Sequence, residues 1–253
     1  MEIQREAYLN QLIERRDNGM IKIVTGIRRC GKSYLLFTIF KRYLLESGVP
    51  EDHIIELALD GIENEELRDP KVCFRYITDA MRGDGPYYLL LDEVQFMPRF
   101  EEVLNSLLRM SNIDVYVTGS NSKMLSSDIL TEFRGRSDEI RVHPLSFAEY
   151  YSAVGGDKQD AFEDYAFYGG MPLILSRPND AAKMAYLKSL FSEVYLKDIV
   201  ERKKIKREDV LSAILDLLCS SIGSLTNPTK VAATINTVQK RSGENVVALN
   251  TGK

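Results

Sequence analysis

Residues 26–33 read Gly-Ile-Arg-Arg-Cys-Gly-Lys-Ser, a complete match to the phosphate-loop (Walker A) pattern G-x-x-x-x-G-K-[ST]. A short β-branched run, residues 21–25, precedes this loop, and an apolar run, residues 34–40, follows it. The sequence therefore predicts a strand, a glycine loop and a helix in that order. In this arrangement the amides at the start of the helix and the helix dipole both favour a bound phosphate. We expect the chain to bind a nucleoside triphosphate here.

The loop assigns roles to several of its side chains. Lys32 is expected to reach the β- and γ-phosphates of ATP, and the Ser33 hydroxyl is expected to hold Mg²⁺. Two interpretations stay open for Arg28 and Arg29: they contact phosphate, or they face outward as structural or partner-facing groups. Cys30 is expected simply to fill its position. The predicted nucleotide-binding residues of this segment are Gly26, Ile27, Arg28, Arg29, Cys30, Gly31, Lys32, Ser33 and Tyr34.

A second part of the site is expected after the apolar run at residues 87–91, which ends in Asp92 and Glu93. Such a run predicts a buried parallel strand whose carboxyl end opens into a site. Asp92, the Walker B position, is predicted to hold Mg²⁺, and Glu93 to orient and deprotonate an attacking water. The alternative is a core strand that ends in an acidic turn. The phosphate loop upstream favours the catalytic interpretation.

A further strand is predicted at residues 113–118, followed by polar residues. Asn121 and Ser120 are candidates to touch the γ-phosphate or the attacking water, with Thr118 behind them. The other interpretation is a strand-to-helix turn in which Ser or Asn caps the helix. Both interpretations stay open, and Asn121 is kept as a candidate nucleotide-binding residue.

Several motifs together carry a family resemblance. Over most of residues 1–240 the chain resembles the prokaryotic AAA+ ATPases of the group near the STAND and archaeal-type ATPases. Members of this group often join the ATPase domain to a C-terminal restriction-nuclease-like domain. The matching stretches are residues 25–33, 91–95, 118–122, 135–136, 144–150 (Pro-Leu-Ser-Phe-Ala-Glu-Tyr), 168–172 (Tyr-Gly-Gly-Met-Pro) and 196–199. Within the last stretches, Gly169-Gly170 is expected to form a tight turn between helices, with a hinge role as the second interpretation.

The resemblance also assigns a role to Arg136. In AAA+ proteins an arginine from this side of the core commonly reaches the γ-phosphate held by a neighbouring subunit, which implies a homo-oligomer. Arg136 is the better candidate and Arg134 the weaker one. The other interpretation of Arg136 is a solvated side chain, or an ion pair with Asp138 or Glu139.

The order of elements predicts an α/β fold, a P-loop NTPase parallel sheet covered by helices on both faces. The fifth strand is expected at residues 140–142. After Leu145 helical periodicity dominates, with helices expected at 179–205, at 208–222 and from Asn227-Pro228 onward. The expected domains are a P-loop AAA+ ATPase core at 1–145, a helical lid at 146–207 and a partial winged-helix-like segment at 208–253.

The resemblance leads us to expect more chain than this sequence holds. In related proteins a further helix and wing would follow the winged-helix start, and then the nuclease-like domain. Here the sequence stops at Lys253, so we expect a C-terminally truncated member whose polar tail is disordered without its partner helix.

The composition limits which binding partners we expect for this chain. The net charge of −4 and the sequence pI of about 5.4 give no global basic field for nucleic acid, so DNA binding stays undecided. One basic run, residues 202–207, is either a solvated helix end or a nucleic-acid contact.

No apolar run approaches 18 residues and residues 1–6 are polar, so we expect a cytoplasmic protein without a membrane partner. The three cysteines are expected to be free thiols, and the two histidines lack zinc-ligand spacing.

Two functions are consistent with these observations. The first is an AAA+ ATPase that hydrolyses ATP with Mg²⁺ and couples the nucleotide state to movement of the lid or of a neighbouring subunit. The second is a STAND-like signalling or defence switch with slow turnover, linked to DNA. A P-loop kinase is a weaker third, because the lid is mostly apolar and acidic and the Asp92-Glu93 pair favours activation of water.

Overall fold

The computed structural model describes residues 3–83, 85–119, 133, 135–196, 199–200, 204–205, 208–225 and 227–241. The chain divides into two compact units, Met1–Tyr186 and Leu187–Lys253, and each is described by itself. Among the described residues, the three cysteines are free thiols, as expected.

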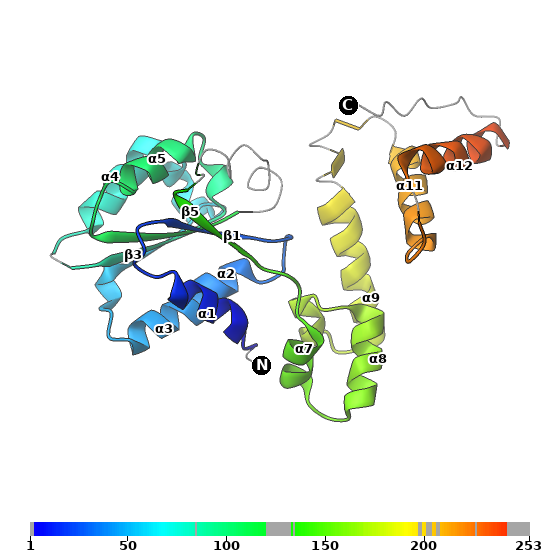
Figure 1. The fold of residues 1–253 in the computed structure, drawn as a ribbon, viewed down its shortest axis with the longest axis horizontal. Helices are drawn as coiled ribbons and strands as arrows, with labels where there is room; N and C mark the ends of the chain where they lie inside the picture. The colour runs from blue at the N-terminus through cyan, green and yellow to red at the C-terminus, as the bar shows by residue number, and fades with distance from the viewer. Residues whose placement is uncertain are drawn as a thin grey trace. The chain divides into compact units, whose positions relative to one another are not determined.

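A five-stranded parallel sheet forms the centre of the first unit (Figure 1). Its strand order is β2-β3-β4-β1-β5, and every neighbouring pair is parallel. The strands are β1 (Ile21–Thr25), β2 (Ile54–Ala58), β3 (Tyr87–Asp92), β4 (Ile113–Thr118) and β5 (Ser137–Arg141). Because all strands run the same way, their carboxyl ends meet at one edge of the sheet, where the phosphate loop and Asp92 both lie.

Helices cover both faces of the sheet, which confirms the predicted fold class (Figure 1). On one face, α4 (Pro70–Ala80) and α5 (Phe100–Leu107) share a hydrophobic core with residues of the sheet that include Ile21 and Ile23 of β1. The opposite face packs against α1 (Glu6–Glu14) and the helix that follows the phosphate loop. That helix consists of α2 (Lys32–Tyr34), a π-helical segment (Leu35–Phe40) and α3 (Lys41–Glu46). Burial on both faces explains why β3 is apolar almost throughout.

The fifth strand starts earlier than predicted, at Ser137 instead of Ile140. β5 is an edge strand that pairs only with β1, and its first three residues are polar and not fully buried. Hydropathy alone therefore detects only the buried Ile140. The first helix, α1 (Glu6–Glu14), is followed by residues 15–20, which form the turn into β1.

Beyond β5, the described residues contain no strand, in agreement with the predicted change to helix. The first unit continues with α7 (Phe147–Val154), α8 (Lys158–Tyr168) and a 3₁₀ segment (Pro172–Ser176), and α9 (Asp180–Ser189) begins in this unit and ends in the second. The helix predicted at 179–205 turns π-helical at Leu190–Leu196. In the second unit, α11 (Glu208–Ser220) and α12 (Pro228–Arg241) contact each other, and both start where the sequence predicts. The change at residue 145 falls inside the first compact unit, so the three-domain division stays a proposal.

A buried polar cluster links β1 to β4 near the amino-terminal ends of the strands. Lys22 is fully buried and its ammonium pairs with the carboxylate of Asp114, while also donating to the Met20 carbonyl at 3.0 Å. The second carboxylate oxygen of Asp114 accepts from the Tyr116 hydroxyl at 2.8 Å and from the Asp17 N–H at 3.0 Å. The Asp114 carboxylate therefore balances the charge of the Lys22 ammonium and also orients Tyr116 and Asp17.

We expect Asp114→Asn to lower the free energy of unfolding by about 3–5 kcal/mol, because the variant leaves the Lys22 ammonium buried without its counter-charge. Urea denaturation of the purified chain measures this loss. Asp79→Asn, on the exposed side of α4, is the matched control and should change stability by less than about 0.5 kcal/mol. Equal stability of the two variants would show that the cluster does not depend on the charge of Asp114.

Candidate nucleotide site

The phosphate loop has the backbone that its glycines allow. Gly26 has a φ of +150°, and a Cβ there would lie 2.3 Å from the Val142 carbonyl oxygen, so no side chain fits. Gly31 has a φ of +99° and caps the start of α2 in the left-handed conformation. These two positions let the loop wrap tightly and present its amides at the helix start, as a bound phosphate requires.

Lys32 is held inside this loop. Its side chain is only 4% exposed, and its Nζ donates to the carbonyl oxygens of Gly26 at 3.2 Å and Ile27 at 3.3 Å. The ammonium thus already lies within the curve of the loop, where the pattern expects it to meet phosphate. Cys30 is buried with its Sγ 3.5 Å from the Val142 carbonyl oxygen, and burial raises the pKa of its thiol, as is typical of a packing cysteine.

The ends of β3 and β4 join this loop through hydrogen bonds. Asp92 is 4% exposed, and its carboxylate accepts a hydrogen bond from the Thr118 hydroxyl. Burial raises the pKa of Asp92, and the hydroxyls of Thr118 and Ser33 oppose that shift. Thr118 also accepts from the Glu93 N–H at 3.1 Å. The structure therefore brings together Ser33, Asp92 and Glu93 as predicted, and Thr118 bonds to the side chain of Asp92 and to the backbone of Glu93.

Glu93 has an unusual backbone. Its φ of 51° and ψ of 48° are left-handed, a conformation that costs a residue with a side chain some strain. The conformation directs the half-buried side chain into the cavity described below, where Gln95 donates a hydrogen bond to its carboxylate. Strain kept at the residue predicted to be the base is typical of a functional position.

The donor set fits Mg²⁺. The hydroxyl of Ser33 and the carboxylate of Asp92 are both oxygen ligands, and Ser33 lies near enough to lower the pKa of Asp92. Magnesium in proteins commonly takes one or two carboxylates and completes its shell with water and substrate phosphates. Among the described residues there is no group of three or more His, Cys, Asp or Glu side chains that would build an all-protein cage. A cation here would also favour the charged form of the buried Asp92.

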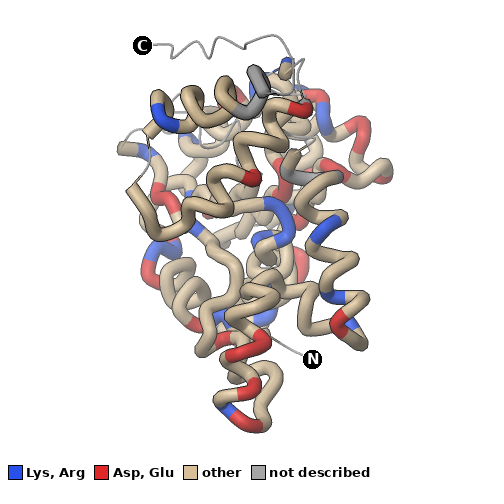
Figure 2. Tube along the Cα trace, turned by 90° about the vertical axis from the view of Figure 1, so that its right-hand side faces the viewer, with Lys and Arg blue, Asp and Glu red and all other residues tan. Residues whose placement is uncertain are grey.

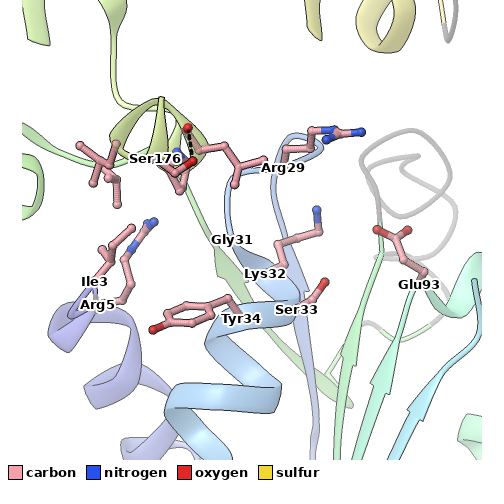
Figure 3. A pocket seen from close by; sticks show the side chains of 13 residues that line it. Ile3, Arg5, Arg29, Gly31, Lys32, Ser33, Tyr34, Glu93 and Ser176 are labelled. Carbon is pink, nitrogen blue, oxygen red and sulfur yellow. Dashed lines mark hydrogen bonds between the residues drawn. The ribbon is translucent and has the colours of Figure 1, made fainter. Parts of the chain in front are cut away.

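A cavity of about 480 Å³ opens beside these residues (Figure 3). Its volume lies in the range of small-molecule sites. One part is polar, with Arg29, Lys32, Ser33 and Glu93. The rest is largely apolar. The other lining residues are Ile3, Arg5, Gly31, Tyr34, Leu145, Pro172, Leu173, Leu175 and Ser176. A ligand with a charged end and a flat apolar end would fit the polar and apolar parts of this cavity.

The Gly-Gly-Met-Pro motif contributes to the apolar side. Gly169, with a φ of +72°, ends α8 in a tight turn, as predicted. Gly170 has a different role, because a Cβ there would lie 2.1 Å from the Leu145 carbonyl oxygen. The Leu145 N–H donates to the Gly170 carbonyl at 2.7 Å. This close backbone pairing places Pro172 and Leu173 at the cavity wall, a role that the sequence pattern alone does not reveal.

Arg5 is a residue that the sequence analysis missed. It is 3% exposed, and its guanidinium donates to the carbonyls of Cys30 at 3.3 Å and His143 at 2.7 Å. It also pairs with the Glu149 carboxylate at 2.8 Å. Glu149 and Ser146 form the capping box that starts α7. The S-x-x-E signature in Pro-Leu-Ser-Phe-Ala-Glu could have revealed this cap. The residues around Arg5 carry no pattern that predicts its ion pair with Glu149.

Other predicted site residues lie elsewhere. Arg136 is at the amino-terminal edge of the sheet, where its carbonyl accepts from the Ile21 N–H at 3.0 Å and its guanidinium donates to Asn105 at 2.8 Å. The five-residue strand β1 separates it from Gly26 by roughly 16 Å. Arg136 therefore does not belong to the site of its own subunit. Asn121, Ser120, Arg134 and most of the basic run at 202–207 lie outside the described residues.

Of the loop residues, Ile27 packs against the core between the sheet and α1, while Tyr34, 36% exposed, lines the cavity. Arg29 lines the cavity and Arg28 does not. Of the predicted nucleotide-binding segment, Arg29, Gly31, Lys32, Ser33 and Tyr34 line the cavity.

A family model described as an AAA domain matches residues 18–151. The chain belongs to the AAA domain family. In general terms it is therefore a nucleotide-binding protein of the ATPase type, in agreement with its sheet and phosphate loop. A second model, for a domain of unknown function, matches residues 159–249.

The curated relatives are longer than this chain. An uncharacterized protein of Haemophilus influenzae is 33% identical over 239 residues, which cover 92% of this chain and 59% of the relative. An uncharacterized protein of Methanocaldococcus jannaschii is 26% identical over 84% of this chain and 49% of its own length. The chain thus spans about half the length of the curated relatives it matches.

Two solved structures are similar at low identity. PCH-2 of C. elegans aligns with a TM-score of 0.42 and 14% identity over 95% of this chain and 62% of its own. The Aeropyrum pernix ORC1 protein, solved in complex with DNA, aligns with a TM-score of 0.41 and 14% identity over 98% of this chain and 80% of its own. Among the described helices, none has the length and apolar character that crossing a membrane requires.

Proposed function

We propose that this chain binds ATP with Mg²⁺ in the 480 Å³ cavity and hydrolyses it to ADP and phosphate. The observation that carries the proposal is the hydrogen-bonded group at the carboxyl edge of the sheet. There, Thr118 hydrogen-bonds to the Asp92 carboxylate and to the backbone N–H of Glu93, and Ser33 lies near Asp92. This group would supply the metal ligands and the base of a site that also includes the Lys32 ammonium.

Each part of the cavity has a role in this proposal. The loop amides and Lys32 bind the phosphates, the ammonium exchanging its contacts with the Gly26 and Ile27 carbonyls for phosphate oxygens. Ser33 and Asp92 hold Mg²⁺, which when bound neutralises charge on the phosphates. The apolar wall of Leu145, Pro172 and Leu173 accepts the base. Glu93 orients a water and takes its proton.

The same cavity supports coupling to the helical part of the chain. Its lining combines the phosphate loop with residues 172–176, and Arg5 connects the loop carbonyl of Cys30 to Glu149 on α7. An occupant would contact both groups of residues, so its phosphate state could alter how α7 and the 3₁₀ segment pack on the loop. Movement of a lid spanning residues 146–207, and a winged-helix role for residues 208–253, belong to this proposal.

The STAND-like switch with slow turnover is the second candidate. It is compatible with the hydrogen bond from Gln95, which occupies one oxygen of the Glu93 carboxylate. Phosphate release from ATP, with and without Mg²⁺, tests the primary proposal. Turnover that needs Mg²⁺ supports an ATPase, whereas tight ATP binding without multiple turnovers supports the switch.

DNA is the partner that the sequence left undecided. In Figure 2 basic and acidic residues are interspersed along the described chain. Adding DNA to the phosphate-release assay decides between a DNA-stimulated ATPase and one that acts without DNA.

Arg136 is proposed to complete the site of a neighbouring subunit. Since it lies at the sheet edge opposite its own loop, Arg136→Ala and Lys32→Ala should each be nearly inactive alone, yet partly recover activity when mixed. An arginine supplied in trans can raise turnover by about 10³-fold or more. Turnover of the mixture, measured beside size-exclusion chromatography, checks this. Full activity of a strictly monomeric Arg136→Ala protein would contradict the trans role.

A further inference from the structure

Arg29 differs from its neighbour Arg28 in where its side chain lies. Arg29 is exposed and lines the cavity together with Lys32, Ser33 and Glu93, whereas Arg28 does not line it. Figure 3 shows the Arg29 side chain passing over Lys32 toward the side of the cavity where Glu93 lies. The guanidinium therefore faces the region between the phosphate-binding lysine and the candidate base.

The backbone of Arg29 is in a conformation that favours glycine. Its φ is 65°, in the left-handed region, where a Cβ is strained against the following carbonyl. A glycine would adopt this turn of the loop without strain. The presence of a long cationic side chain at a strained position of a phosphate loop indicates that the side chain itself has a role.

The charges around Arg29 leave room for an anion. Among the described residues the Arg29 guanidinium has neither a hydrogen bond nor an ion pair, whereas Arg5 on the same cavity wall is neutralised by Glu149. Arg29 and Lys32 thus place two cations on one side of the cavity. A guanidinium binds phosphate oxygens through two parallel N–H groups, which a point charge such as an ammonium cannot do.

We propose that Arg29 contacts the terminal phosphate of the nucleotide bound in its own subunit, and so makes the site select nucleoside triphosphates over diphosphates. This inference rests on the proposed ATP site and adds the residue that distinguishes the two phosphate states. Lys32 spans the β- and γ-phosphates, while the water that Glu93 would activate attacks the γ-phosphate. The Arg29 guanidinium faces the space between Lys32 and Glu93, so it would contact the γ-phosphate of ATP. ADP lacks this phosphate, and the guanidinium then has no phosphate partner.

The test compares dissociation constants of a non-hydrolysable ATP analogue and of ADP, both with Mg²⁺, by isothermal titration. Arg29→Ala should raise the constant for the analogue by roughly tenfold or more and change the constant for ADP by less than about twofold. Arg29→Gly, which suits the left-handed backbone, should show the same loss of selectivity in a chain at least as stable to heat. Arg29→Lys should retain part of the selectivity.

Two further variants make the comparison specific. Arg28→Ala should shift both constants by the same factor, because its side chain lies outside the cavity. Arg75→Ala, on α4 and remote from the loop, is the control for loss of a positive charge. Equal effects of Arg29→Ala and Arg29→Gly on ATP analogue and ADP, or no effect on either, would overturn the assignment of Arg29. If the wild-type chain binds neither nucleotide, the ATP site itself is wrong, and the inference about Arg29 fails with it.

Discussion

Replacing Glu93 by glutamine should slow ATP hydrolysis by about 10²–10⁴-fold while leaving ATP·Mg²⁺ binding intact. The amide keeps the shape of the side chain and can still meet Gln95, but it cannot accept a proton from water. The Thr118 hydroxyl would continue to hold the backbone of residue 93 through its N–H. Single-turnover phosphate release, measured at saturating ATP, separates the chemical step from binding.

Glu46→Gln, on the exposed end of α3, is the matched control and should hydrolyse ATP at the wild-type rate. Asp92→Asn gives a useful contrast, since it should weaken the Mg²⁺-dependent part of nucleotide binding instead. Hydrolysis at the wild-type rate by the Glu93→Gln protein would mean that Glu93 is not the base.

Lys32→Ala should weaken nucleotide binding by roughly 10²-fold or more, because the variant removes the buried ammonium that lies within the curve of the loop. The fold should persist, since the Nζ contacts only the loop carbonyls of Gly26 and Ile27. Competition with a fluorescent ATP analogue measures the affinity, and thermal unfolding without nucleotide checks the fold. Lys71→Ala, on α4, is the control. An affinity like that of the control would remove Lys32 from the site.

The parts of the fold that were predictable are those encoded by local patterns. The loop from Gly26 to Ser33 and the apolar run before Asp92 are each continuous in sequence, and their strands and helices are where the patterns predict. In a parallel sheet the carboxyl ends of strands meet at one edge, so placing Ser33 beside Asp92 required no more than the strand assignments. Only the hydrogen bonds that Thr118 makes to Asp92 and Glu93 could not be predicted without the structure.

The parts that were not predictable depend on contacts between distant residues. Arg5 reaches Cys30, 25 residues away, and His143, 138 residues away, and no periodicity reports such a contact. The requirement for glycine at Gly170 comes from the approach of the Leu145 backbone, whereas a turn at Gly169 alone would explain only the first glycine of the pair. Edge strand β5 was shortened in the prediction because a strand paired on one side tolerates polar residues.

The sequence also left open the roles of the two loop arginines, because the pattern G-x-x-x-x-G-K-[ST] says nothing about where variable side chains point. The structure separates them by one observation, that Arg29 lines the cavity and Arg28 does not. The same limit applied to Arg136, whose position at the opposite edge of the sheet only the strand pairing establishes.

The most direct test of the central claim is an isothermal titration of ATP into the wild-type chain in the presence and absence of Mg²⁺. The account predicts one nucleotide bound per chain, with an affinity that falls when Mg²⁺ is removed, because Ser33 and Asp92 are poised to share the metal with the phosphates. Absence of ATP binding, in a sample whose folding is verified by thermal unfolding, would contradict it.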